Sequence, residues 1–190
     1  MDRKLIVESW VSLDGYVADK MGKLDFFVKY VRDEYTTAYR RDMLNSIDTI
    51  IFGYKTYVQF STLWPDRPIA NDLLAEKINT SEKIVISRSP GAAPWGQWPA
   101  ATVVTGDPVE KIRALKALPG KDLIIWGSIT IAQALMARNL VDEYHLHICP
   151  TLLAGGKKLF TEEARLGDLS LLDSRQFPTG VIALKYAALN

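Results

Sequence analysis

Short hydrophobic runs recur along the chain and alternate with segments whose apolar residues have helical spacing. The strand-like runs cover residues 5–11, 48–52, 83–87, 102–105, 123–126 and 143–149. The helix-like segments cover residues 26–45, 54–60, 71–79 and 108–118, and a further helix follows Gly127 and Ser128. Strands that alternate with helices predict a mostly parallel sheet covered by helices on both faces.

The end of the chain has a different pattern. Two β-rich runs, 169–176 and 181–187, are separated by Phe-Pro-Thr-Gly, which predicts an antiparallel hairpin that closes the sheet. Residues 12–22 are expected to form a mobile loop, and residues 90–99, rich in Pro, Gly and Trp, a surface loop. The expected architecture is α/β: three αβα layers around a mixed, mostly parallel sheet with a C-terminal hairpin.

Length and charge narrow the classes of partner. The 190 residues suit one domain over residues 1–190, and 23 basic against 22 acidic residues give no tract for binding nucleic acid. No apolar run reaches the roughly 18 residues that span a membrane. A single cysteine, Cys149, excludes an internal disulfide and suits a reducing compartment. We therefore expect a cytoplasmic protein without a nucleic-acid or membrane partner.

Small, hydroxylated or basic residues follow three of the predicted strands. These residues are Gly53, Lys55 and Thr56; Ser87, Arg88 and Ser89; and Gly127, Ser128, Ile129 and Thr130. In an open α/β sheet, ligands bind beyond the carboxyl ends of the strands, and a helix that begins there attracts phosphate. Arg88 and Lys55 suit a nucleotide with an extra phosphate on its ribose. Ordinary turns and helix caps are the alternative interpretation of each segment.

Two common nucleotide motifs are absent from the sequence. It contains neither a Walker A lysine loop nor Gly-x-Gly-x-x-Gly after a strand. Neither a P-loop nor a classical dinucleotide fold is therefore expected.

The run 143–149 carries two histidines on one face. His145 and His147 share this face with Glu143, so a metal site is conceivable, although zinc needs a further ligand and supporting contacts. The favoured interpretation is that the histidines cover a solvent-facing or interface side, and that Cys149 is a buried small hydrophobe. On the other face, Tyr144, Leu146 and Ile148 would pack against a second subunit of a homodimer or against the protein's own core.

Two carboxylates are candidates for catalysis. Asp14 follows the first strand and Asp25 precedes the first helix, where either could supply a proton or bind substrate. Turn geometry beside Gly15 and a helix N-cap are the respective alternatives. Trp10, Phe26 and Trp126 are the candidates for the wall of the substrate pocket.

Several motifs occur together in a familiar order. They are Val-Ser-Leu-Asp-Gly-Tyr-Val-Ala-Asp, Ile-Ile-Phe-Gly-Tyr-Lys-Thr-Tyr, Lys-Ile-Val-Ile-Ser-Arg-Ser, Leu-Ile-Ile-Trp-Gly-Ser and a final Pro-Thr-Leu-Leu-Ala-Gly-Gly-Lys-Lys-Leu-Phe. With them the chain resembles the dihydrofolate-reductase-like superfamily, above all the reductase domain of the riboflavin-biosynthesis deaminase–reductase. The resemblance implies an NADPH-binding reductase with an αβα fold.

The resemblance also implies roles for individual residues. Gly53, Lys55 and Thr56 would face the phosphates of the cofactor, 87–89 the 2′-phosphoadenosine, and 127–130 the pyrophosphate. Val17 and Ala18 would approach the nicotinamide, and Asp14 and Asp25 would lie at the substrate end. The family commonly has Gly-Gly where this chain has Gly127-Ser128, and no deaminase motif (His-x-Glu with Pro-Cys-x-x-Cys) is present.

These features favour an NADPH-dependent reductase that passes hydride to a C=N or C=O bond of a small heterocyclic or sugar-like substrate. The nearest model for such a reaction is 5-amino-6-(5-phosphoribosylamino)uracil reductase. The alternatives are a dihydrofolate reductase and a non-catalytic NADP(H)-binding protein.

Overall fold

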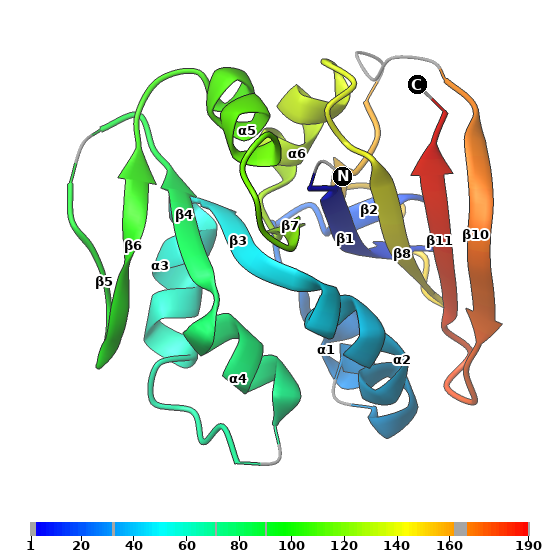
Figure 1. Ribbon diagram of the computed structural model, residues 1–190. Coiled ribbons are helices and arrows are strands. Elements are labelled where there is room, and N and C mark those ends of the chain that lie inside the picture. Colours follow the sequence, from blue (N-terminus) through cyan, green and yellow to red (C-terminus); the bar gives the residue numbers. More distant parts are fainter. Residues whose placement is uncertain (1–2, 32, 71, 90, 162–166, 190) are drawn as a thin grey trace.

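A nine-stranded mixed sheet forms the centre of the protein (Figure 1). The computed structural model describes residues 3–31, 33–70, 72–89, 91–161 and 167–189. The strand order is β10-β11-β8-β1-β7-β3-β4-β6-β5, and a separate small sheet pairs β2 with β9. The strands are β1 (Leu5–Ser12), β2 (Tyr16–Ala18), β3 (Ile47–Gly53), β4 (Glu82–Ile86), β5 (Ala93–Trp95), β6 (Trp98–Val104), β7 (Asp122–Trp126), β8 (Glu143–Cys149), β9 (Lys157–Lys158), β10 (Leu169–Gln176) and β11 (Ile182–Ala188).

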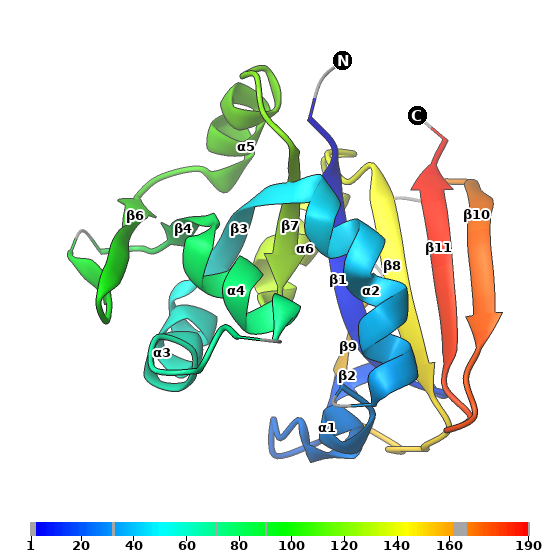
Figure 2. The same cartoon turned by 60° about the horizontal axis from the view of Figure 1, so that its bottom comes forward.

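Helices cover both faces of the large sheet, as Figures 1 and 2 show. One face packs against α5 (Pro108–Lys116) and α6 (Ile129–Met136). The other packs against α2 (Glu34–Ser46), α3 (Tyr54–Leu63) and α4 (Leu73–Thr80), with the short α1 (Asp25–Val31) beside them. The expected three-layer α/β fold is confirmed.

The central strands are parallel and carry near-continuous apolar runs because both of their faces are buried. β8, β1, β7, β3, β4 and β6 run in the same direction, so their carboxyl ends meet at one edge. β10 and β11 form the predicted antiparallel hairpin, which joins the sheet beside β8. The candidate ligand-binding residues predicted from the sequence follow three of these strands, so they lie at this common edge.

The helix expected at 26–45 is divided into α1 and α2. The carboxylate of Asp33 accepts a hydrogen bond from the Thr36 backbone N–H (3.1 Å) and caps α2. A new cap in the middle of the segment lets the chain change direction before α2 packs on the sheet.

The prediction of a surface loop at residues 90–99 is wrong. β5 extends the sheet from the edge of β6, and Trp95 is fully buried. Its ring stacks on Phe52 with centroids 5.9 Å apart, and its indole N–H donates to Asn79 Oδ1 (2.8 Å). Pro94 is tolerated within β5 because an edge strand needs fewer backbone donors.

Segment 12–22 was predicted to be a mobile loop, but it contains the strand β2. The side chains of Val17 and Ala18 are buried, and β2 pairs with β9. Gly156 lies so close that a Cβ on it would overlap the carbonyl oxygen of Ala18. Segments 14–18 and 151–158 are therefore packed against each other.

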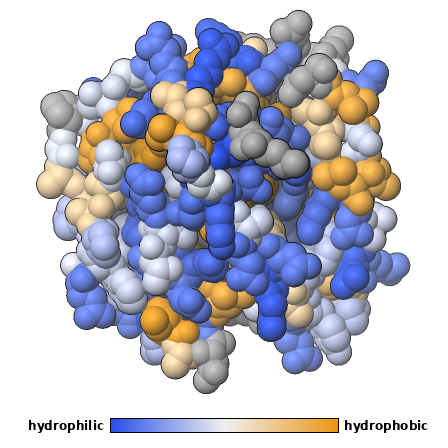
Figure 3. Space-filling model, in the orientation of Figure 1, coloured by the Kyte–Doolittle hydropathy of each residue, from blue (hydrophilic) through white to orange (hydrophobic). Residues whose placement is uncertain are grey.

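The apolar face of β8 is covered by the chain itself. Leu146 is buried, and Tyr144 and Ile148 pack against the same core cluster. Beyond them, all eight residues of the edge strand β10 are exposed, among them Leu171 and Leu172. The apolar patch at the right edge of Figure 3 lies over this side of the sheet. A homodimer stays a prediction.

Across the described ranges, none of the helices has the length and apolar character that crossing a membrane requires.

Candidate functional site

The three predicted ligand-binding segments meet at the carboxyl edge of the sheet. β7, β3 and β4 are neighbours, with Ile51 paired to Ile125 and Gly53 to Ile86. The turns that follow these strands therefore lie side by side, and α3 and α6 begin from two of them.

Gly127 provides a bare stretch of backbone at this edge. Its φ is +66°, and a Cβ there would lie 3.0 Å from Cγ2 of Thr56. Glycine is required for both the left-handed conformation and the close approach to α3. Because Gly127 is exposed, a ligand can reach this backbone directly.

Ser128, the departure from the family pattern, is buried and points inward. Its hydroxyl accepts a hydrogen bond from the Gly53 backbone N–H (2.5 Å) and donates to Thr56 Oγ1 (3.2 Å). The side chain therefore links β3, α3 and α6 and does not cap its own helix. It also occupies a backbone donor, Gly53 N–H, that a phosphate could otherwise use.

Polar side chains around this edge are open to solvent. Lys55, Arg88, Ser89 and Thr130 are exposed, whereas Ser87 and Ile129 are partly buried. Ser87 Oγ accepts a hydrogen bond from the Ser89 N–H (3.2 Å) and so shapes the turn that presents Arg88. Helix N-termini, a left-handed glycine and two accessible cations together fit an anionic dinucleotide.

Asp14 is held by a set of hydrogen bonds. Its carboxylate accepts from Ser12 Oγ (2.6 Å), from the Leu153 N–H (3.1 Å) and from the Ala154 N–H (2.8 Å). The Ser12 hydroxyl and then these backbone groups lower the pKa of Asp14. Asp14 is therefore a carboxylate at neutral pH, and it fixes segment 151–154 beside the first strand. Its catalytic role stays a prediction.

Trp126, a predicted substrate residue, is buried at the end of β7, and the other predicted substrate residues lie around α1. Asp25 is its first residue and is exposed, and Phe26 is partly buried. Trp10 is buried, and its ring stacks between Phe27 (5.8 Å) and His147 (4.3 Å). This aromatic stack forms the wall next to the carboxyl end of β1.

Sequence reasoning missed a buried charged group beneath this wall, which we call the Glu8 cluster (Glu8, Arg40, Trp126 and His147). Glu8 accepts from Arg40 Nε (2.5 Å) and Nη2 (2.8 Å), from Trp126 Nε1 (2.5 Å) and from His147 Nε2 (3.0 Å). Burial by itself would raise the pKa of Glu8, but Arg40 and His147 outweigh it and lower the pKa. The sequence feature that could have revealed this cluster is Glu8 itself, a single glutamate within the apolar run Leu-Ile-Val-Glu-Ser-Trp-Val.

The prediction that the histidines face solvent or an interface is wrong. His145 and His147 are both buried because α2 covers this face of β8. Since a carboxylate only accepts, His147 donates through Nε2, and its Nδ1 has no partner within the described residues. Burial lowers the pKa of His147 despite the opposing effect of Glu8.

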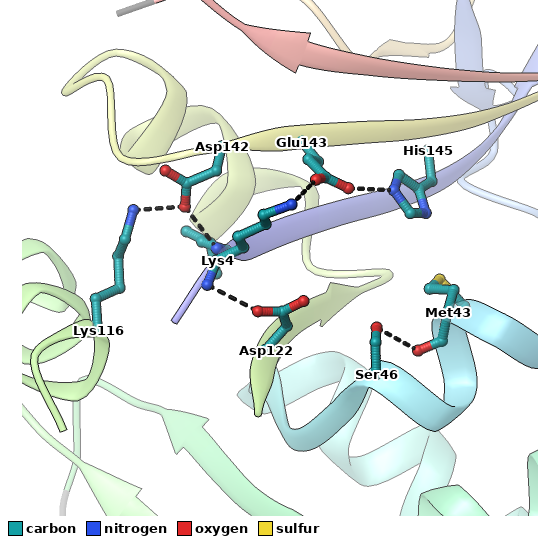
Figure 4. A network of polar contacts seen from close by, with 9 residues as sticks. Lys4, Met43, Ser46, Lys116, Asp122, Asp142, Glu143 and His145 are labelled. Carbon is teal, nitrogen blue, oxygen red and sulfur yellow. Dashed lines mark hydrogen bonds and ion pairs between the residues drawn. The ribbon is translucent and has the colours of Figure 1, made fainter. Parts of the chain in front are cut away.

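His145 belongs to a second group, the Glu143 cluster (Lys4, Glu143 and His145), drawn in Figure 4. Glu143 accepts from Lys4 Nζ (2.6 Å) and from His145 Nε2 (2.9 Å). These partners lower the pKa of Glu143 to about 2, with His145 making the largest contribution. In the described ranges no three His, Cys, Asp or Glu side chains are grouped as metal ligands.

Cys149 lies at the end of β8 and is fully buried, as predicted. Burial raises the pKa of its thiol to about 12. The thiolate form that a nucleophile needs is therefore disfavoured.

Comparisons with known proteins agree with this fold. The protein YyaP of Bacillus subtilis, which is uncharacterised, is 28% identical over 186 residues that cover 97% of this chain and 94% of YyaP. The crystal structure of a protein named for riboflavin biosynthesis from Shewanella sp. PV-4 superimposes with a TM-score of 0.79 at 26% identity, covering 100% of both chains. A dihydrofolate reductase from Enterococcus faecalis shares the fold, with a TM-score of 0.65 at 14% identity over 98% of this chain and 97% of that one.

The family comparison covers almost the whole sequence. Residues 3–183 match the family described as the RibD C-terminal domain. RibD from Acinetobacter baumannii shares the fold (TM-score 0.67, 19% identity), and the match covers 99% of this chain but 58% of that longer one. The chain therefore belongs to the RibD C-terminal domain family.

Proposed function

We propose that this protein is an NADPH-dependent reductase that transfers hydride to a C=N or C=O bond of a small heterocyclic or sugar-like substrate. The observation that carries the proposal is the exposed left-handed turn at Gly127, beside Thr56 and at the same sheet edge as Arg88. Family membership supports a reductase, and the residues at the edge fit a dinucleotide with a phosphorylated ribose.

Each part of the edge would hold a different part of the cofactor. Gly127, Thr130 and Lys55 would hold the pyrophosphate, and Arg88 and Ser89 the 2′-phosphate. Because the side chains of Val17 and Ala18 are buried, their contacts with the nicotinamide would come from the backbone. Bound NADPH supplies the hydride, and the protein supplies binding, orientation and exclusion of water.

The substrate would lie against the aromatic wall of Trp10, Phe27 and His147, with Phe26 edge-on to Phe27. Trp126 lies beneath this wall, bound to Glu8. Asp14 is charged at neutral pH and would accept a hydrogen bond from the substrate, since its low pKa disfavours a role as acid. Asp25, exposed at the start of α1, is then the remaining predicted carboxylate for delivering a proton.

Titration with NADPH, followed through tryptophan fluorescence, tests the cofactor assignment. Arg88→Ala should weaken the binding of NADPH about tenfold or more and that of NADH much less. The reason is that a phosphate–guanidinium contact contributes more than about 1 kcal/mol to the binding free energy. Arg113→Ala, at an exposed position on α5, is the matched control. Equal weakening of both dinucleotides by Arg88→Ala would refute the 2′-phosphate role.

Turnover separates the reductase from a non-catalytic NADP(H)-binding protein. Pyrimidine, pterin and flavin compounds are supplied with NADPH, and loss of nicotinamide absorbance is followed. Turnover of a pterin would favour a dihydrofolate reductase, whereas turnover of a ribosylaminopyrimidine would favour a riboflavin-type reductase. Binding of NADPH with no turnover across the set would favour the non-catalytic alternative.

A further inference from the structure

The carboxylate of Glu8 joins three elements at one point. Arg40 comes from α2, Trp126 from β7 and His147 from β8, and all three donate to it within 2.5–3.0 Å. The Glu8 side chain is 2% exposed. An ionised carboxylate is retained in such a place only when its charge and lone pairs are matched, as they are here.

One of these donors connects the cluster to the proposed cofactor edge. Trp126 is the last residue of β7, directly before the Gly127–Ser128 turn, and it is paired in register with Glu8. Its indole has a single N–H, and that N–H is bound to Glu8 Oε2. The side-chain orientation of the residue that leads into the turn is therefore fixed by Glu8.

The other donors extend this connection to the substrate wall. His147, bound through Nε2, stacks on Trp10 with centroids 4.3 Å apart. Arg40 anchors α2, whose Tyr39 lies edge-on to His147. A single buried carboxylate thus holds both Trp126 and the ring that supports Trp10.

We propose that Glu8 is a positioning residue of the dinucleotide site, acting through the Trp126 indole to hold the Gly127–Ser128 turn in the geometry that receives a pyrophosphate. The inference rests on the proposed function, because it takes this edge to be the NADPH site. The inference predicts different effects on two parts of the ligand. Binding of the pyrophosphate depends on Glu8, whereas binding of the 2′-phosphate at Arg88 does not.

The test uses calorimetric titration of the whole chain with NADPH and, separately, with 2′-AMP, together with the melting temperature. Glu8→Gln should lower the affinity for NADPH about fivefold or more and change the affinity for 2′-AMP by no more than about twofold. Displacing the Gly127–Ser128 turn should weaken the binding only of the group that this turn contacts. Glu143→Gln is the matched control, because it alters a buried Glu–His pair at the other end of β8. It should leave the affinity for both ligands unchanged.

A second variant allows the inference to be tested even if Glu8→Gln does not fold. Trp126→Phe retains an aromatic ring and removes only the N–H donor, while Arg40 and His147 still bind Glu8. It should reproduce the selective loss of NADPH affinity, and it carries the test if Glu8→Gln does not fold. An unchanged NADPH affinity in the folded variants, or equal losses for NADPH and 2′-AMP, would overturn the inference alone. A wild-type protein that binds no NADPH would overturn the proposed function and the inference with it.

Discussion

The Glu8 and Glu143 clusters have similar chemistry and different surroundings. Both consist of a glutamate between a histidine and a basic side chain, on the same face of the sheet. The Glu8 and Arg40 side chains are 2% and 7% exposed, whereas Lys4 in the Glu143 cluster is 56% exposed. Water can therefore replace part of the Glu143 cluster, but α2 and Trp10 prevent this around Glu8.

Position along the strands makes the difference relevant to function. Glu143 begins β8 and lies toward the amino ends of the parallel strands, as Figure 4 shows with Lys4 and Asp122 nearby. Glu8 lies farther along β1 and is bonded to the last residue of β7. Similar groups thus lie at opposite ends of the parallel strands, and only the Glu8 cluster contacts the edge that carries the proposed ligand site.

Removing the basic partner should give the largest contrast between the clusters. Arg40→Ala leaves Glu8 buried without its main counter-charge and should cost about 3–5 kcal/mol of unfolding free energy. Lys4→Ala removes an exposed partner and should cost about 1 kcal/mol or less. Urea unfolding of both variants measures the difference, and equal losses would contradict the distinction between them.

The turn above the Glu8 cluster should be the next most sensitive position. Gly127→Ala forces a side chain into the left-handed region and against Thr56, so it should cost about 2 kcal/mol. Gly22 has a similar φ of +77° and no neighbour within 4 Å, so Gly22→Ala reports the backbone contribution without the clash. A Gly127 variant no less stable than the Gly22 variant would show that the approach to α3 is not tight.

Acid should affect the Glu8 cluster first. Because burial lowers the pKa of His147 in the folded chain, the unfolded chain takes up this proton first as the pH falls below about 6.5. The contribution of His147 to stability is therefore present at higher pH and lost below that value. Melting temperatures from pH 8 to 5 should show the loss, and His147→Gln should reduce it. An identical pH profile in this variant would assign the loss to other groups.

The Glu143 cluster should respond in a more acidic range and to a smaller extent. The pKa of Glu143 is about 2, below the ordinary 4.5 of a glutamate. The contribution of Glu143 to the free energy of unfolding is therefore present above pH 4.5 and lost as the pH falls toward 2. Glu143→Gln should cost about 1 kcal/mol at pH 7 and little at pH 2.5. Unfolding curves at the two pH values measure the change, and a constant cost would contradict it.

The sequence predicted the parts of the fold that depend on local pattern. Apolar runs located β1, β3, β4, β7 and β8, and the glycine or hydroxyl residues after them lie at one sheet edge, as predicted. Binding of a ligand at that edge stays a prediction. Alternation along β8 showed that His145 and His147 share a face, but it could not show that α2 covers that face. That fact depends on the long-range contact between Arg40 and Glu8, which no local pattern encodes.

The missed strands have a similar explanation. Trp95 lies among Pro and Gly residues that resemble a loop, and its burial depends on Phe52 and Asn79. β2 is three residues long, and only its partner β9 makes it recognisable. Residues that depend on distant partners were the ones that local reasoning misassigned.

The close packing of segments 14–18 and 151–158 has a consequence for protein engineering. Asp14 binds the backbone of Leu153 and Ala154, and Gly156 has no space for a side chain beside Ala18. A loop taken from a relative would therefore bring only half of a matched surface. Chimeras with a relative should therefore exchange both segments together as one module.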